Sequence, residues 1–263
     1  MNKKTLVIIV LVIAAAAAFA YLEFFSSGAC QVCSYDGVQV SQSFMQNLKI
    51  GNSTFSAVKI GAAETQGLST ENGTNLTYGG KPEILYIGAE YCPFCAAERW
   101  AMVIALSRFG TFSNLHYMTS SASDTYASTP TFTFYNSSYS SPYISFVSVE
   151  TETNVGSGGY YAPLQNMSAE QASIIEGYDK SGSIPFIDFA NKTVITGATY
   201  NPQTLAGYNW TYIASQLNNP NDTISQSVVG SANLITAEVC MADGNQPQSV
   251  CGLGYIKQIQ EFA

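Results

Sequence analysis

The sequence predicts an α/β domain, with a central sheet flanked by helices, that follows an N-terminal transmembrane helix. Three observations support this fold class. Short apolar runs such as Glu83–Ile87 are typical of buried strands, and helix-forming stretches alternate with them. Apolar residues make up 46% of the 263-residue chain, enough for a substantial core. One long apolar run stands at the very start of the sequence.

This run, Leu6–Leu22, is nearly long enough to span a bilayer as a helix. Two lysines precede it and no Lys or Arg follows closely, so the positive-inside rule places the remainder outside the cytoplasm. We expect residues 1–25 to be an uncleaved single-pass anchor in the cell membrane, with residues 5–25 in contact with the lipid bilayer. The alternative is a signal peptide cleaved after Ala20, which would release a secreted protein.

The composition fits an exported protein and argues against nucleic-acid binding. Charged residues make up only 11% of the chain, and 10 Lys+Arg against 18 Asp+Glu give a net charge of -8. So few cations cannot neutralise a phosphate backbone. Glycan-acceptor sequons, which are modified only on exported proteins, predict a glycoprotein. They begin at Asn52, Asn72, Asn75, Asn136, Asn166, Asn191, Asn209 and Asn221.

The chain after the anchor divides into two parts. Residues 26–80 form a polar lead-in with a short helix between Ser41 and Ile60. Residues 81–263 form the α/β domain, and an insertion of about 121–167 enlarges it. A strand over Leu115–Met118 is expected after the first helix of the domain.

Inside the insertion, Phe132 and Phe134 alternate with threonines, and Ile144 and Phe146 alternate with polar residues. This period of two predicts two strands, which we interpret as a hairpin. Three helices are expected after it. They are a helix from the capping box at Ser168 to about Tyr178, one over Tyr212–Leu217 and one over Ser231–Cys240.

The six cysteines form three local pairs. In an exported chain an even number of cysteines predicts disulfides, although the sequence leaves their pairing open. The members are Cys30 and Cys33, Cys92 and Cys95, Cys240 and Cys251. The two Cys-x-x-Cys pairs stand too far apart for a zinc ribbon, so we expect no metal and no cofactor. A copper or zinc chaperone remains an alternative, to be tested by metal content.

The second pair carries the chemistry. Cys92-Pro93-Phe94-Cys95 follows a buried strand, and Pro93 suits the first position of a helix that Gly110 would end. The free N–H groups and the dipole at a helix N-terminus favour a thiolate on Cys92. Cys95, one turn inside, would be shielded and able to close a disulfide.

Two stretches resemble the thioredoxin superfamily. Ala89–Cys95 is similar to its active-site turn, and Gly182–Phe189 is similar to its cis-proline strand. Gly88–Phe109 further resembles an archaeal family of membrane-anchored thioredoxin-like proteins of unassigned function. The resemblance implies a thioredoxin-like sheet and a redox-active centre at Cys92 and Cys95. It also implies contacts with the substrate, made by Tyr91, Pro93, Phe94, Ile184 and Pro185.

The sequence departs from thioredoxin in the surroundings of this pair. Tyr86 stands where thioredoxins carry a buried acidic residue, so proton transfer to Cys95 would need another group. Glu90 places a negative charge near Cys92, which opposes thiolate formation. We expect Glu98 and Arg99 to lie on a solvated face of the helix.

These observations predict a membrane-tethered thiol–disulfide oxidoreductase. Its partners would be client proteins with cysteines and a membrane electron-transfer protein. The alternative is a surface binding or structural module on the same scaffold, in which Cys92–Cys95 only staples the fold. We expect Cys240–Cys251 to be a structural disulfide, while Cys30 and Cys33 form either a second redox pair or a small structural loop.

Overall fold

The computed structural model describes residues 34–70, 73–157 and 159–261. The expected anchor and the pair Cys30 and Cys33 lie outside the described residues. Among the described helices, none combines the length and the apolar character that crossing a bilayer requires.

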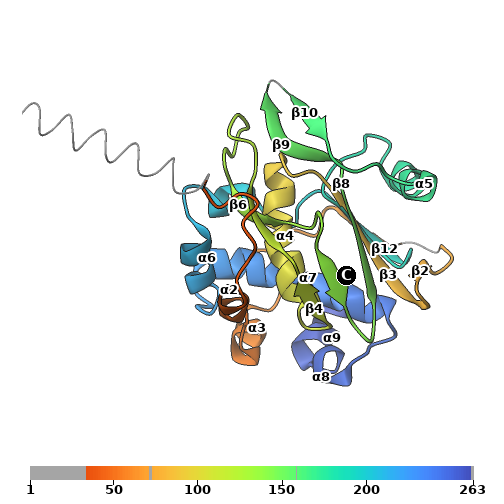
Figure 1. Cartoon of the computed structure of the whole chain (residues 1–263). Coiled ribbons are helices and arrows are strands. Elements are labelled where there is room, and N and C mark those ends of the chain that lie inside the picture. Colours follow the sequence, from red (N-terminus) through yellow and green to blue (C-terminus); the bar gives the residue numbers. More distant parts are fainter. Residues whose placement is uncertain (1–33, 71–72, 158, 262–263) are drawn as a thin grey trace, which may run out of the picture. The chain divides into compact units, whose positions relative to one another are not determined.

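A mixed six-stranded sheet forms the centre of the domain (Figure 1). Strands β1, β12, β11 and β3 follow one another with antiparallel pairing, and β8 then pairs in parallel with β3. Short β2 joins the beginning of β3. The bounds are β1 Leu68–Thr70, β2 Thr77–Tyr78, β3 Lys81–Gly88, β8 Ser145–Glu150, β11 Phe186–Phe189 and β12 Thr193–Thr196.

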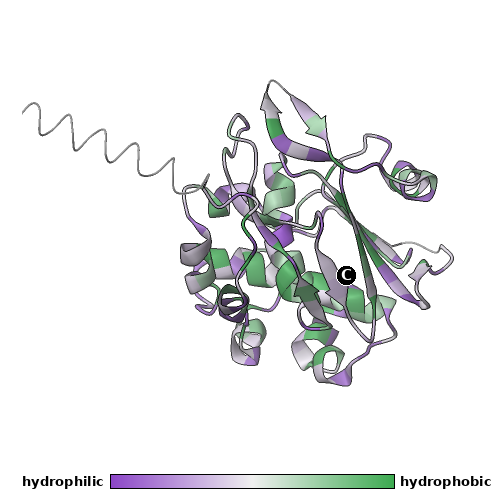
Figure 2. Ribbon diagram, viewed as in Figure 1, coloured by the Kyte–Doolittle hydropathy of each residue, from purple (hydrophilic) through white to green (hydrophobic). Residues whose placement is uncertain are grey.

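Helices cover both faces of the sheet. On one face, α5 (Ala169–Tyr178) packs Ile175 against Leu85 and Ile87 of β3. On the other face lie the two longest described helices, α4 (Pro93–Leu106) and α7 (Thr223–Ala242), which pack against each other. The apolar residues shown in green in Figure 2 concentrate on these central strands and helices, as burial of apolar surface requires.

Nearly every residue of α4 is buried, although its sequence predicts only a one-sided apolar stripe. The helix packs against α7 and β6 (Pro130–Thr133), and one of its side chains, Arg99, reaches Glu150 at the end of β8. A helix buried all round is a core element. The turn that begins α4 is therefore fixed by the centre of the fold.

The two strands predicted in the insertion exist, but the hairpin between them is wrong. Phe132 lies in β6, which pairs with β5 (His116–Thr119). Phe146 lies in β8, a strand of the central sheet. An alternating pattern identifies a strand without identifying its partner. β8 pairs in parallel with β3. Parallel neighbours need a long crossover connection, and the chain between these two strands, which includes α4, provides it.

Two further small sheets complete the strands. β4 (Thr111–Ser113) pairs with β7 (Ser138–Ser140), and β9 (Glu152–Ser157) pairs with β10 (Tyr160–Pro163). The second of these lies inside the predicted insertion and projects above the carboxyl end of β8 (Figure 1).

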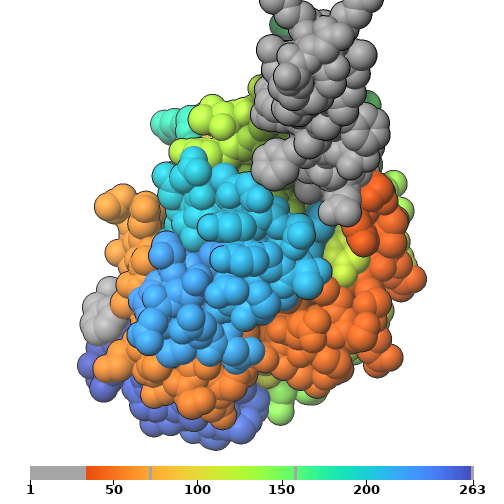
Figure 3. All heavy atoms as spheres, turned by 90° about the vertical axis from the view of Figure 1, so that its left-hand side faces the viewer, coloured from red at the N-terminus to blue at the C-terminus, as the bar shows by residue number. Residues whose placement is uncertain are grey.

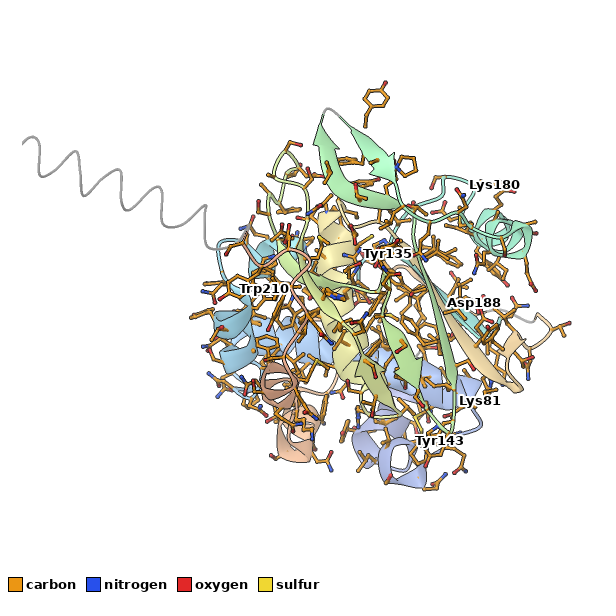
Figure 4. All side chains as sticks on the ribbon, viewed as in Figure 1. Lys81, Tyr135, Tyr143, Lys180, Asp188 and Trp210 are labelled. Carbon is orange, nitrogen blue, oxygen red and sulfur yellow. A yellow bond between two sulfur atoms is a disulfide. The ribbon has the colours of Figure 1, made fainter. Side chains whose placement is uncertain are left out.

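Most helix predictions are confirmed, with shifted ends. The capping box at Ser168 is formed with Gln171, and α5 ends at Tyr178. Helix α6 (Trp210–Gln216) begins at Trp210, whose Nε1 donates to the Thr131 carbonyl at 2.6 Å (Figure 4). The helix expected over Ser231–Cys240 is only the second half of α7, because the Asp222 carboxylate caps it much earlier.

The lead-in contains two helices, α2 (Gln42–Asn47) and α3 (Asn52–Val58), where one was expected. They lie beside α6 and the start of α7, as the orange and blue surfaces show in Figure 3. Asn218 joins the two regions by accepting the Gly51 N–H at 3.1 Å. The remaining elements are a 3₁₀ turn (Pro202–Leu205), α8 (Gln248–Cys251) and α9 (Gly254–Gln260).

Candidate functional site

The Cys92–Cys95 pair lies at the N-terminus of α4, directly after β3. Cys92 is the N-cap residue with extended backbone (φ -73°, ψ 121°), and Pro93 is the first helical residue, as predicted. The Cys95 backbone N–H donates to Cys92 Sγ at 3.3 Å. Cys92 therefore takes the capping role that a Ser or Asp oxygen usually fills, and its sulfur faces the free N–H groups of the helix.

The two sulfurs differ in exposure and in acidity. Cys92 is 6% exposed and Cys95 is fully buried, and both are free thiols. The hydrogen bond from the Cys95 side chain lowers the pKa of Cys92, and the Cys95 and Phe94 backbone N–H groups and Arg99 add to this effect against burial. Burial raises the pKa of Cys95 well above its ordinary value. The arrangement thus separates a slightly exposed, more acidic thiol from a fully buried, weakly acidic one.

The loop before β11 lies next to Cys92. The Ile184–Pro185 peptide bond is cis, and the Cys92 thiol points at the Ile184 carbonyl oxygen, 3.9 Å away. Ile184 is half-buried and Pro185 is buried. The structure therefore brings together two segments that the sequence separates by about ninety residues, as the resemblance implied.

The aromatic residues on either side of Cys92 in the sequence contact rings from other segments. Phe94 is 42% exposed and meets Tyr126 edge to face, with ring centroids 5.8 Å apart. Tyr91 stacks on Tyr161 of β10 at 4.1 Å, with nearly parallel rings. The β9–β10 pair therefore contacts the turn that carries Cys92 through this stack, while Pro93 is buried.

Arg99 lies in the core, so its placement on a solvated helix face is wrong. Its side chain is fully buried, and its Nε and Nη2 donate to the two carboxylate oxygens of Glu150 at 2.9 and 2.6 Å. Nη2 also donates to the Ala89 carbonyl at 2.7 Å. Glu150, at the end of β8, supplies the opposite charge that makes burial of a guanidinium tolerable.

Glu98 is likewise buried, which corrects the same prediction. Its carboxylate accepts the backbone N–H and the hydroxyl of Thr199, both at 2.8 Å. Burial raises the pKa of Glu98 to about 7. Neither burial was predicted, because the apolar pattern of a helix does not tell whether its remaining faces are covered by other elements.

Tyr86 and Glu90 complete the surroundings of the pair. Tyr86 is fully buried, and among the described residues its hydroxyl has no hydrogen-bond partner. Its ring lies 5.8 Å from the Arg99 guanidinium carbon. The Glu90 carboxylate accepts from the Thr133 hydroxyl at 2.7 Å.

The Cys240–Cys251 disulfide is present, as predicted, with its Cα atoms 5.6 Å apart. It joins the end of α7 to α8. No group of three or more metal-ligating side chains gathers in the described parts of the chain.

The sequence did not single out Glu150, Tyr126 or Tyr161 as neighbours of the pair. A charge signal existed for Arg99, since a Glu-Arg pair interrupts an otherwise apolar helix in a chain with few charges. The partners of these residues come from distant segments and had no local signal.

Comparisons with known proteins give one match. No curated protein and no solved structure matches the chain. The sequence profile of one family matches residues 69–241, well over half of the chain, from β1 to near the end of α7. The matched range contains Cys92, Cys95 and the Ile184–Pro185 loop. The chain therefore belongs to the family described as "Domain of unknown function (DUF929)".

Proposed function

We propose that this chain is a thiol–disulfide oxidoreductase with a thioredoxin-like fold, acting on protein disulfides or thiols through Cys92 and Cys95. The observation that carries the proposal is the position of Cys92 Sγ. It accepts the Cys95 N–H at the start of α4 and is the more exposed sulfur of a Cys-x-x-Cys pair. A lowered thiol pKa at a helix N-terminus is the arrangement that makes a cysteine nucleophilic at neutral pH.

In the reducing direction, the Cys92 thiolate attacks one sulfur of a client disulfide. A Cys92–client bond forms, the client S–S bond breaks, and the released client sulfur takes up a proton. Cys95 then attacks Cys92 Sγ and its proton passes to the departing client sulfur, so that the Cys92–client bond breaks, the Cys92–Cys95 disulfide closes and the second client thiol is released. Two electrons and two protons pass from the pair to the client.

The reverse sequence transfers the disulfide to client thiols. In an oxidising compartment this direction is favoured, because the surrounding redox poise keeps the pair oxidised. A membrane electron-transfer protein would then accept the two electrons and restore the disulfide. The N-terminal apolar run would tether the domain to the membrane beside such a partner, on the extracytoplasmic side.

We expect the client to contact the groups that lie next to Cys92. The Ile184 carbonyl, 3.9 Å from Cys92 Sγ, would accept a hydrogen bond from the client main chain, next to Pro185. The exposed Phe94 ring and the Tyr91–Tyr161 stack offer apolar surface on the other side.

A trapping experiment tests the proposal. The Cys95→Ser variant keeps Cys92 but removes the resolving thiol, so a defined peptide disulfide should accumulate as a stable mixed disulfide on Cys92, seen by intact mass. The Cys92→Ser variant, with Cys95 intact and buried, is the matched control and should form none.

The kinetics of alkylation give the second test. The rate of Cys92 alkylation should reach its half-maximum at a pH below that of a free cysteine thiol. A wild-type rate no faster than a free thiol, with no mixed disulfide in the Cys95→Ser variant, would favour the alternative of a structural module with a stapling pair.

A further inference from the structure

Arg99 is a positive charge that acts on both cysteines of the pair. It stands four residues after Cys95 on α4, so the two side chains share one face of the helix. Both are fully buried. A buried guanidinium is rare in proteins unless it is paired, and here it lies one helical turn from a thiol.

The hydrogen bonds of Arg99 hold it against the Cys92 turn. Nη2 donates to the carbonyl of Ala89, three residues before Cys92, and the fork of Nε and Nη2 grips Glu150 of β8. The bidentate geometry fixes the plane of the guanidinium. Among the described residues, Nη1 has no hydrogen-bond partner, so one buried N–H face of the cation is not used for structure.

Stability alone is a weak reason for this ion pair. Replacing a buried ion pair by apolar side chains of similar volume is often neutral or stabilising, because desolvation costs about as much as the attraction returns. Arg99 lies one helical turn from Cys95, so its charge can change how readily the two thiols ionise. Arg99 lowers the pKa of both Cys92 and Cys95, whose ionised forms are negative.

Resting on the proposed function, we propose that the Arg99–Glu150 ion pair controls how readily Cys92 and Cys95 form thiolates. Arg99 stabilises negative charge on the sulfurs, and Glu150 orients the guanidinium and limits how strongly its charge acts. Tyr86 on β3 is uncharged, unlike a carboxylate at that position. The charged groups that act on the sulfurs come from α4 and β8 instead. The titratable and charged groups around the pair are Tyr86, Glu90, Tyr91, Arg99, Glu150 and Glu152.

The proposal makes two neighbouring substitutions act in opposite directions. Arg99→Met removes the positive charge, so the midpoint pH of Cys92 alkylation should rise by at least about one pH unit, a tenfold loss of thiolate at fixed pH. Glu150→Gln keeps the shape but removes the opposing charge, so the midpoint should fall. Arg99→Lys should restore most of the wild-type midpoint.

The experiment uses the full chain and follows alkylation and thiolate absorbance against pH, with circular dichroism as the check on folding. If Arg99→Met does not fold, Arg99→Met/Glu150→Gln keeps the core neutral and should still show a midpoint above that of the wild type. A loss of packing alone predicts no opposite shifts. Equal midpoint pH values in folded variants, or shifts of the same sign for Arg99→Met and Glu150→Gln, would overturn the inference. The proposed function would still hold in that case, because wild-type Cys92 would remain reactive. An unreactive wild-type Cys92 is a different result and would refute both.

Discussion

The buried carboxyl of Glu98 should make the protein more stable in mild acid than at neutral pH. In the folded chain this carboxyl is removed from water and held by Thr199, and its pKa rises from 4.5 to about 7. In the unfolded chain it ionises near 4.5. Between these two values the folded state binds the proton more tightly, so stability falls as the pH rises through this window and is fully retained below it.

The magnitude follows from the two pKa values. Each unit of difference corresponds to about 1.4 kcal/mol, so Glu98 alone should cost roughly 3 kcal/mol of unfolding free energy between pH 4 and pH 7.5. The Glu98→Gln substitution introduces a neutral side chain of the same shape, whose amide oxygen can still accept a hydrogen bond from the Thr199 N–H. The variant should lose this part of the pH dependence, whatever its stability at any single pH.

Urea unfolding at several pH values between 4 and 7.5 measures the effect. The two tryptophans, Trp100 and Trp210, are buried and report unfolding by fluorescence. Glu176→Gln is the matched control, because Glu176 is exposed on α5, and it should keep the wild-type slope. A Glu98→Gln slope equal to that of wild type and control would refute the reasoning.

Three further predictions concern separate parts of the fold. Replacing Cys240 and Cys251 by serine should lower the unfolding free energy by about 3 kcal/mol, because a covalent constraint on the unfolded chain is lost. Thermal melting measures this loss, and the rate of Cys92 alkylation should not change. Ser168→Ala should cost about 1 kcal/mol by removing the cap of α5, whereas Ser168→Thr should keep most of it, as urea unfolding at fixed pH would show. Phe94→Ala should raise KM for a peptide disulfide several-fold and change stability by only about 1 kcal/mol, since the ring is largely exposed and meets Tyr126 only at its edge. An unchanged KM, with Phe94→Leu as reference, would exclude a role for the ring in client contact.

Two other carboxyls, on buried Glu238 and half-buried Asp243, act in the same direction as Glu98. Burial raises the pKa of Glu238 to about 7 and that of Asp243 to about 6. Each of these carboxyls should therefore increase the unfolding free energy as the pH falls from neutral. We therefore expect the whole protein, and not only one site, to gain stability as the pH falls from about 7 to about 5.

The sequence by itself determined the local features of this protein. The capping box at Ser168 and the proline at the start of α4 act within a single turn of chain, so their signals are complete in a few residues. For the same reason the sequence predicted that Cys92 would lie at the helix N-terminus and that Cys95 would be the shielded member of the pair. The Cys240–Cys251 disulfide also closes over a short stretch of chain.

The tertiary structure decided what depends on distant partners. The parallel pairing of β8 with β3, instead of a hairpin, joins two strands that lie far apart in the sequence, and α4 between them packs on α7. The packing around α4 buries Glu98 and Arg99, which a solvated helix would expose, and brings Glu150 to the guanidinium. Burial of a charge is favourable only where its partner arrives, and that partner is supplied by a strand about fifty residues away.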